Sequence, residues 1–301
     1  MSAHGSTSSD SLLEQHLDEV RKLMAGCLAE TPLYSALSDC KSLFGTGKML
    51  RSRLILRVGP ASGADYSSLL RAAASVELIH AASLLHDDVI DGGFLRRGAP
   101  SFWVDKGIPA AILLGDLLLF KALELVTPVE DGRLLPVIIR LTGEVCEAES
   151  EQELVSRGQL ADWNACVNIA RRKTGALFAF AAYAAGGSDP ALNDALQETG
   201  YLAGTAYQLA DDILDAHGDT ESAGKTLGLD EARDKTTAVR VKLPENIDPV
   251  QTINDLLAAA RAGLDSWPKV RAAWDVYVTR DLHPALSQCV KLTGNSAPLS
   301  S

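Results

Sequence analysis

The chain has 301 residues, 47% of them hydrophobic and 22% charged, so it is long and apolar enough to bury a large core. Its formal net charge of −11 argues against nucleic acid and anionic membranes as partners, because both attract a positive surface. Five scattered cysteines without a CxxC pair, and a polar N-terminus without the apolar segment of a signal peptide, predict mostly buried, reduced thiols in a cytoplasmic protein.

Apolar residues recur at three- and four-residue steps along most of the chain, which is the pattern of helices with a buried face. Helices are predicted over residues 11–30, 66–91, 109–126, 134–158, 160–187, 190–219 and 249–292. Clusters of Gly, Pro, Asn and Asp separate them, and no long stretch alternates as a strand does. No apolar run is long enough to cross a bilayer, so no integral membrane segment is expected. The prediction is an all-α fold, a single large helical bundle over residues 11–290 between disordered tails at 1–10 and 291–301.

Two aspartate motifs of the form DDxxD stand in otherwise apolar helical sequence. Asp87 and Asp91 lie one helical turn apart and share a face, with Asp88 between them, and Asp211 and Asp215 form the second such pair. Like charges one turn apart repel, so one pair alone is more often a solvated surface. Two pairs on facing helices instead predict an oxygen-lined mouth for Mg²⁺, which prefers carboxylates and completes its shell with substrate phosphates.

Basic residues accompany both motifs, and each alone is more often surface charge. They are Arg96 and Arg97 in LRRG, Lys48 and Arg51 in GTGKMLRSR, Lys173 beside Thr174 in RRKTG, and Lys225 and Lys235 in GKTLGLDEARDKTT. Next to two metal motifs they predict clamps for a diphosphate, because Arg offers a bidentate fork and Lys a point charge. His80 lies two turns before Asp87 on about the same face, where a buried core histidine and a ligand are equally good interpretations.

In this order, these motifs resemble the trans-prenyl diphosphate synthases, also called polyprenyl synthetases. The family pattern reads GGKRxRP, DDxxD-x4-RRG, KT, Q-x2-DDxxD and GKxxGxDxxxGKxT. The corresponding segments here are GKMLRS, DDVIDGGFLRRG, KT, QLADDILD and GKTLGLDEARDKTT, which together span about residues 45–237. Two aspartate motifs with an interposed KT and a flanking RRG are a specific signal.

The resemblance implies an isoprenoid-synthase fold with a central apolar cavity, and a homodimer. It implies a prenyltransferase that condenses isopentenyl diphosphate with dimethylallyl, geranyl or farnesyl diphosphate. Three Mg²⁺ ions would be held by Asp87, Asp91 and Asp211, with Asp88 and Asp215 in support. The implied allylic-diphosphate contacts are Arg96, Lys173, Thr174, Gln208, Lys225 and Lys235, and the implied isopentenyl-diphosphate contacts are Lys48, Arg51, His80 and Arg97. The basic residues and metal ions stabilise the leaving diphosphate, which itself serves as the base.

Three departures from the pattern are Met49 for an arginine, Ser52 for a proline and Asp234 for a glycine. Lys48 and Arg51 are retained, so the first two departures are expected to tune the loop. Asp234 is expected to weaken the attraction of the neighbouring lysine for phosphate. No metal ligand or clamp is lost, and an active enzyme is expected.

Product length is predicted from the residues four and five before the first aspartate, which close the tunnel in this family. Here they are Ser83 and Ala82, both small, where farnesyl-length enzymes carry aromatic residues. Ser83 lies ~6 Å below Asp87 by helical rise. The product is therefore predicted to be C20 or longer. The floor of the tunnel is expected deeper, at a side chain such as Val76, Ile79, Leu118 or Phe120.

Two other functions share parts of this pattern. A class I terpene cyclase has the same fold and the first DDxxD motif, but its second motif is usually an Asn/Ser/Glu set, whereas this chain has DDILD. A non-catalytic subunit of a heteromeric prenyl synthase typically lacks one or both aspartate motifs, and this chain keeps both.

Overall fold

The computed structural model describes residues 4–29, 31–33, 47–96, 98–129, 132–156, 162–217 and 248–290. Its helices are α1 (His4–Ala29), α2 (Leu50–Ser62), α3 (Tyr66–Ile90), α4 (Phe102–Lys106), α5 (Ile108–Val126), α6 (Leu134–Leu154), α7 (Trp163–Ala170), α8 (Ala176–Ala184), α9 (Pro190–His217), α12 (Pro249–Ala262), α13 (Pro268–Tyr277) and α14 (His283–Val290). The π-helical turns η3 (Arg171–Gly175) and η4 (Val278–Leu282) join α7 to α8 and α13 to α14. A short antiparallel hairpin, β1 (Leu95–Arg96) and β2 (Ala99–Pro100), follows α3. The predicted all-α class is confirmed.

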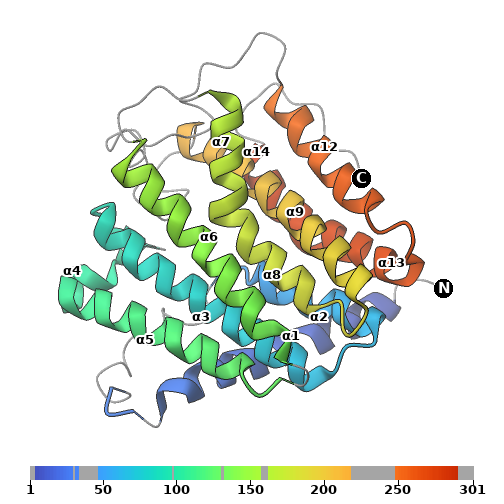
Figure 1. Ribbon diagram of the computed structural model, residues 1–301, viewed down its shortest axis with the longest axis horizontal. Coiled ribbons are helices and arrows are strands. Elements are labelled where there is room, and N and C mark those ends of the chain that lie inside the picture. Colours follow the sequence, from blue (N-terminus) through green and yellow to red (C-terminus); the bar gives the residue numbers. More distant parts are fainter. Residues whose placement is uncertain are drawn as a thin grey trace.

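Helix α3 lies inside the bundle and packs against α5, α2, α1 and α8 (Figure 1). Its residues 72–79 are all buried, as expected for a helix with apolar residues on every side. Among the described helices, α3 alone has the length and hydropathy of a membrane span, and 67% of that apolar window is buried within the protein. Its composition is therefore explained by its place in the core.

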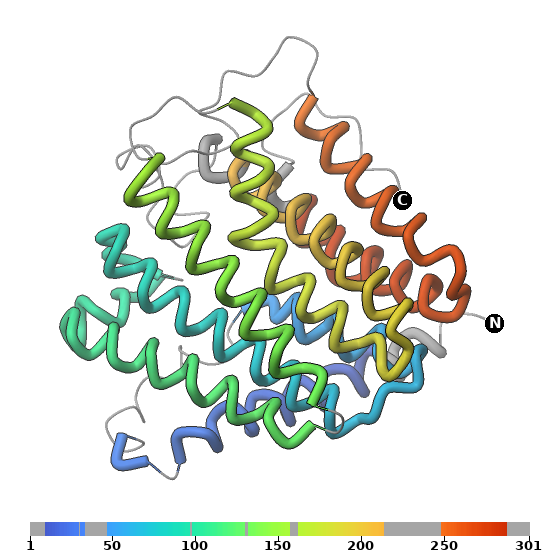
Figure 2. Tube along the Cα trace, in the orientation of Figure 1, coloured from blue at the N-terminus to red at the C-terminus, as the bar shows by residue number. Residues whose placement is uncertain are grey.

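Helices α6, α9 and α12 complete the bundle beyond α8. Helix α8 packs between α9, α2 and α6, and α12 covers α9. Figure 2 traces α7, η3 and α8 as one long rod, with α6 and α9 on either side. A continuous hydrophobic cluster extends through the described helices from Leu13 in α1 to Leu286 in α14.

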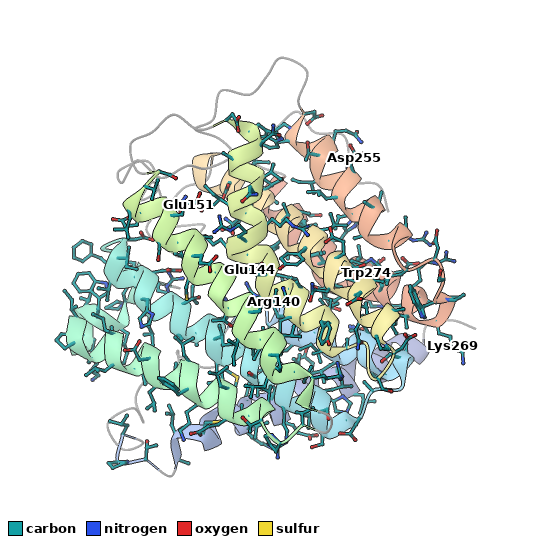
Figure 3. All side chains as sticks on the ribbon, viewed as in Figure 1. Arg140, Glu144, Glu151, Asp255, Lys269 and Trp274 are labelled. Atoms are coloured by element: carbon teal, nitrogen blue, oxygen red, sulfur yellow. The ribbon has the colours of Figure 1, made fainter. Side chains whose placement is uncertain are left out.

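Hydrogen bonds and ion pairs join the outer face of α6 to this rod and to α9. Arg140, Glu144 and Glu151 are labelled along α6 in Figure 3. Arg140 Nη2 donates to Gln197 at 2.8 Å, Glu144 accepts from Tyr201 Oη at 2.5 Å, and Glu151 pairs with Arg172 at 2.5 Å. These contacts fix the rotation of α6, so that its other face, with Val145 and Glu149, looks into the bundle.

Several predicted boundaries differ from the structure. Residues 249–292 were expected as one helix, but a turn at 263–267 separates α12 from α13, because Pro268 begins a new helix instead of continuing one. Helix α2 was not predicted at all. The disordered tail expected at 1–10 stays a prediction, and in the structure α1 begins at His4. Within α1, the Asp10 carboxylate accepts from Arg57 and Arg280, each at 2.8 Å, and so joins this helix to α2 and η4. Residues 1–3 and 291–301 lie outside the described residues.

The side chains of three cysteines, Cys27, Cys146 and Cys166, are described, each as a free thiol. Cys166 is buried, and burial raises its pKa to about 12. Cys146 is exposed, which corrects the expectation of mostly buried thiols for that residue, because it lies on the solvent side of α6.

Candidate active site

The first aspartate motif lies at the C-terminal end of helix α3. Asp65 caps the start of the helix by accepting from Ser68 N at 2.9 Å, and the helix ends at Asp91. Gly92 follows with φ +63°, a conformation that favours glycine and turns the chain out of the helix. The motif therefore stands at the negative end of the α3 dipole, where carboxylates are unfavourable unless a cation is near.

Asp88, the second aspartate of the motif, is bound by an arginine. The side chain of Arg96 donates from Nε and Nη2 to both carboxylate oxygens of Asp88, at 2.6–2.9 Å. Asp88 is 5% exposed, so this charge is compensated inside the protein. Arg96 reaches back because the β1–β2 hairpin folds over the end of α3, held by Ser101 N to Phe94 O at 2.9 Å and by the Phe94 and Trp103 rings, whose centroids are 5.4 Å apart.

The second aspartate motif lies near the end of α9, where a chain of side-chain hydrogen bonds reaches it from η3. Thr174 Oγ1 donates to Gln208 Oε1 at 2.5 Å, and Gln208 Nε2 donates to Asp212 Oδ1 at 2.7 Å. The π-helical turn at η3 places Lys173 and Thr174 at the junction of α7 and α8. Glycine is required at position 204, where α9 and η3 approach closely, since a Cβ at Gly204 would lie 2.7 Å from Gly175 Cα.

Lys173, the first residue of the KT motif, forms an ion pair with Glu149 of α6. Both side chains are mostly buried, with 25% and 18% of their surface exposed. Glu149 was not predicted as a site residue, because it lies in an acidic stretch of α6 that resembles a solvated surface. It holds the lysine at the edge of the cavity.

The basic segment before and within α2 meets α3 and α8. Arg51 stacks on Phe178, with Cζ 4.9 Å from the ring centroid. Burial lowers the pKa of the Arg51 guanidinium, while the Glu77 carboxylate acts to raise it. Ser52, next in the chain, donates to Glu77 from its backbone N and from Oγ. The arginine therefore has an aromatic face and a buried carboxylate beside it.

All of these elements line one cavity of about 450 Å³. Its lining contains the predicted residues Lys48, Arg51, His80, Ser83, Asp87, Asp88, Asp91, Arg96, Lys173, Thr174, Gln208 and Asp211. Lining residues that were not predicted include Met24, Glu77, Val145, Glu149, Leu177, Phe178, Tyr207 and Asp212. Their partners lie on other helices, so local spacing carries little signal for them, except that Glu77 shares the helical face of His80 and Asp88.

Some predicted residues do not line this cavity. Ala82 is fully buried and lies outside the lining, because its position on α3 is turned away from the face that carries His80, Leu84 and Asp87. Phe120 is 67% exposed, so it is a surface residue and not a floor. The other suggested floor residues, Val76, Ile79 and Leu118, are buried but do not line the cavity. Arg97, Lys225, Asp234, Lys235 and the side chain of Asp215 lie outside the described residues.

The carboxylates suit a hard cation that arrives with a substrate. Asp87, Asp91 and Asp211 line the cavity from α3 and α9. In the described part of the chain, no three His, Cys, Asp or Glu side chains converge closely enough to hold a metal unaided. Mg²⁺ commonly takes one or two carboxylates and fills its shell with water and phosphate oxygens. Asp88 is not part of this set, because Arg96 occupies both of its oxygens.

Comparison with known proteins agrees with this arrangement. The model of the polyprenyl synthetase family matches residues 36–271. An octaprenyl diphosphate synthase from Haemophilus influenzae is 35% identical over 197 residues, 64% of this chain and 60% of that protein. A farnesyl diphosphate synthase from Geobacillus stearothermophilus is 33% identical over 246 residues, 75% of this chain and 82% of that protein.

A solved structure has the same fold. The crystal structure of a polyprenyl synthase from Caulobacter crescentus, complexed with calcium and isoprenyl diphosphate, superposes with a TM-score of 0.70 and 27% identity. The superposition covers 93% of this chain and 90% of that one. By sequence, the chain matches 60 to 63% of the length of the first curated relatives.

Proposed function

The chain belongs to the polyprenyl synthetase family, and we propose that it condenses isopentenyl diphosphate with an allylic diphosphate to give a longer all-trans prenyl diphosphate. The observation that carries this proposal is that one cavity is lined by both aspartate motifs, by the KT of η3 and by the basic start of α2. Such a cavity can hold two diphosphates at once, one near the carboxylates and one near Lys48 and Arg51.

We assign the allylic diphosphate to the side of the cavity between α3, α9 and η3. Arg96 and Lys173 supply donors there, and the Thr174 hydroxyl, whose proton Gln208 accepts in this structure, donates to a phosphate once that proton turns away from Gln208. Asp88 fixes the Arg96 fork, so less side-chain entropy is lost when a phosphate binds. Lys173 must leave its ion pair with Glu149 to bind the substrate phosphate. Its flexible side chain can make this change without a change of fold.

We assign three Mg²⁺ ions to Asp87, Asp91 and Asp211, with Asp215 in support. When bound, Mg²⁺ supplies positive charge to the diphosphate leaving group as its C–O bond breaks. The side chains of Leu84, Val145 and Leu177 make the adjoining wall apolar, which excludes water from the reactive carbons. Isopentenyl diphosphate is held by Lys48, Arg51 and His80, so that positioning supplies much of the rate.

We propose a product of C20 or longer. Ser83 lines the cavity one turn below Asp87, and a small side chain there leaves room for the growing chain. The relatives are named as synthases of products from farnesyl to octaprenyl diphosphate, so their names do not fix the product length of this chain, which has to be measured.

We also propose a homodimer, because the outer side of α5 exposes an apolar surface. Ile108, Ile112, Leu113 and Phe120 are 42–67% exposed, and a patch of this kind marks an interface more often than a free surface. Light scattering of the purified protein tests this, and a monomer at micromolar concentration contradicts it.

The reaction is tested by incubating the protein with Mg²⁺, labelled isopentenyl diphosphate and each allylic primer in turn, followed by chromatography of the dephosphorylated products. Incorporation of label into C20 or longer alcohols is expected. A terpene cyclase would instead convert an allylic diphosphate alone, and a non-catalytic subunit would convert neither substrate. Either result overturns the proposal.

A further inference from the structure

Helix α2 begins without a side-chain cap of its own. Its N-cap residue, Met49, has φ +49°, a left-handed conformation that is unfavourable for a residue with a side chain, and it makes no capping hydrogen bond. An N-cap residue normally offers an oxygen to the backbone N–H two or three positions later. The thioether of Met49 is a poor acceptor, so the first turn of α2 needs another one.

Glu77 of α3 supplies that acceptor. Ser52 is the third residue of α2, and its backbone N donates to Glu77 Oε1 at 3.2 Å. The Ser52 hydroxyl lies 2.9 Å from the same oxygen and 3.3 Å from Ala73 O, so the carboxylate is the nearer acceptor for its single proton. Ser52 is fully buried and Glu77 is 8% exposed. A buried carboxylate thus takes over the role of the missing cap.

The same carboxylate acts on Arg51, the residue before Ser52. Three described side chains act electrostatically to raise the pKa of Arg51. One is the carboxylate of Glu77, and the other two are the phenols of Tyr207 and Tyr277. The buried Nε of Arg51 has no hydrogen-bond partner in the described part of the chain. Phe178 covers the guanidinium plane, which leaves its orientation to the stacking and to the nearby charge.

Two arginines of the cavity are therefore held differently. Asp88 binds Nε and Nη2 of Arg96 with both oxygens, which fixes the orientation of that guanidinium. In Glu77, Oε1 already accepts from Ser52, so this carboxylate balances the charge of Arg51 without capturing the fork in a two-oxygen pair. The outer donors of Arg51 stay available to a phosphate.

We propose that Glu77, held by Ser52, is a positioning residue that fixes the first turn of α2 and so presents Arg51 and Lys48 to the diphosphate of isopentenyl diphosphate. This inference rests on the proposed function, which assigns those two basic residues to that substrate. Glu77 acts through Ser52 and Arg51, and no step of the proposed reaction uses its carboxylate.

The test compares Glu77→Gln and Ser52→Ala with Ser75→Ala. Ser75 is the matched control, because it is equally buried on α3 and donates one hydrogen bond, to Ala122 O at 2.7 Å, but does not line the cavity. KM is measured separately for isopentenyl diphosphate and for the allylic substrate. Hydrogen exchange of a peptide covering residues 48–56 reports on the first turn of α2 without requiring activity.

We expect Glu77→Gln to raise KM for isopentenyl diphosphate about tenfold, because it removes the charge from the acceptor of Ser52. We expect Ser52→Ala to raise the same KM about threefold, because it removes one hydrogen bond from a neutral hydroxyl. KM for the allylic substrate stays within about twofold of wild type, and exchange in 48–56 accelerates for Ser52→Ala. Ser75→Ala changes neither KM nor this exchange.

Two results overturn the inference. If wild type is active but both KM values shift together, or neither shifts, Glu77 is merely structural. If wild type incorporates no isopentenyl diphosphate, the proposed function fails, and the role of Arg51 in binding that substrate fails with it. The wild-type assay thus distinguishes the two failures.

Discussion

Neighbouring aspartates in the first motif are expected to respond in opposite ways to the same substitution. Asp88 is 5% exposed and accepts three hydrogen bonds from Arg96, whereas Asp87 lines the cavity at the negative end of α3. Asp87→Asn and Asp88→Asn each remove one charge and keep the shape of the side chain. The first is expected to reduce activity and the second stability.

The size of the stability effect follows from these contacts. In Asp88→Asn an amide NH₂ group faces the Arg96 donors, so hydrogen bonds to a charged group worth about 1.5–3 kcal/mol are lost. The lower end applies because 33% of the Arg96 side chain is exposed. For a chain of this size that corresponds to a fall in melting temperature of about 2–3 °C. Asp87→Asn relieves repulsion at the helix end, worth about 0.3–1 kcal/mol, so its melting temperature stays level or rises slightly.

The activity effect runs the other way. Loss of a carboxylate that holds a leaving-group cation is expected to reduce kcat by about a hundredfold or more. Thermal unfolding is followed by circular dichroism in EDTA, and kcat is measured with saturating Mg²⁺. Asp255→Asn on the exposed face of α12 serves as the control for a lost surface charge. Equal losses of stability in both variants, or an Asp88→Asn protein that melts like wild type, would refute the reasoning.

Further predictions concern product length, the KT lysine and the metal. Ser83→Phe is expected to shorten the product, which product chromatography measures. Ala82→Phe overpacks the core, so it is expected to lower the free energy of unfolding by about 1–3 kcal/mol in thermal melts and to leave the product length unchanged. Glu149→Gln releases Lys173 from its ion pair, so calorimetry is expected to show about threefold tighter binding of inorganic pyrophosphate. Adding Lys173→Met is expected to abolish this gain, and weaker pyrophosphate binding by Glu149→Gln would contradict the prediction. EDTA removes prenyl transfer and excess Mg²⁺ restores it, and activity that survives complete chelation contradicts the metal assignment.

Much of the fold follows from the sequence where one helix face or a whole helix is apolar. Helix α3 begins after the Asp65 cap and ends at the aspartates, as the pattern predicts. Helix α2 escaped prediction because Arg51, Arg53 and Arg57 interrupt its apolar residues. Two of these arginines pair with Asp281, which lies more than 220 residues further along the chain. A local pattern carries no sign of a partner that only the tertiary fold supplies.

The same limit explains what was predicted of the site. The DDxxD spacing identified two of the helices that line the cavity, because i and i+4 positions share a face whatever the rest of the chain does. The partners of the charged residues did not follow from spacing. Glu149 meets Lys173 from α6, and Glu77 meets Ser52 from α3, so both pairs depend on how helices pack.

The placement of the aspartates is itself an argument for what the site binds. Asp87, Asp88 and Asp91 stand together at the negative end of α3, where each carboxylate opposes the dipole by about 0.3–1 kcal/mol, in addition to their mutual repulsion. Arg96 takes both oxygens of Asp88 and so compensates that one charge. Basic residues at η3 and at the start of α2 line the same cavity. A cation bound together with a polyanion relieves both sets of charges at once, because the cation satisfies the carboxylates and the anion satisfies the lysine and arginine side chains. The lining is thus complementary in charge to a magnesium diphosphate.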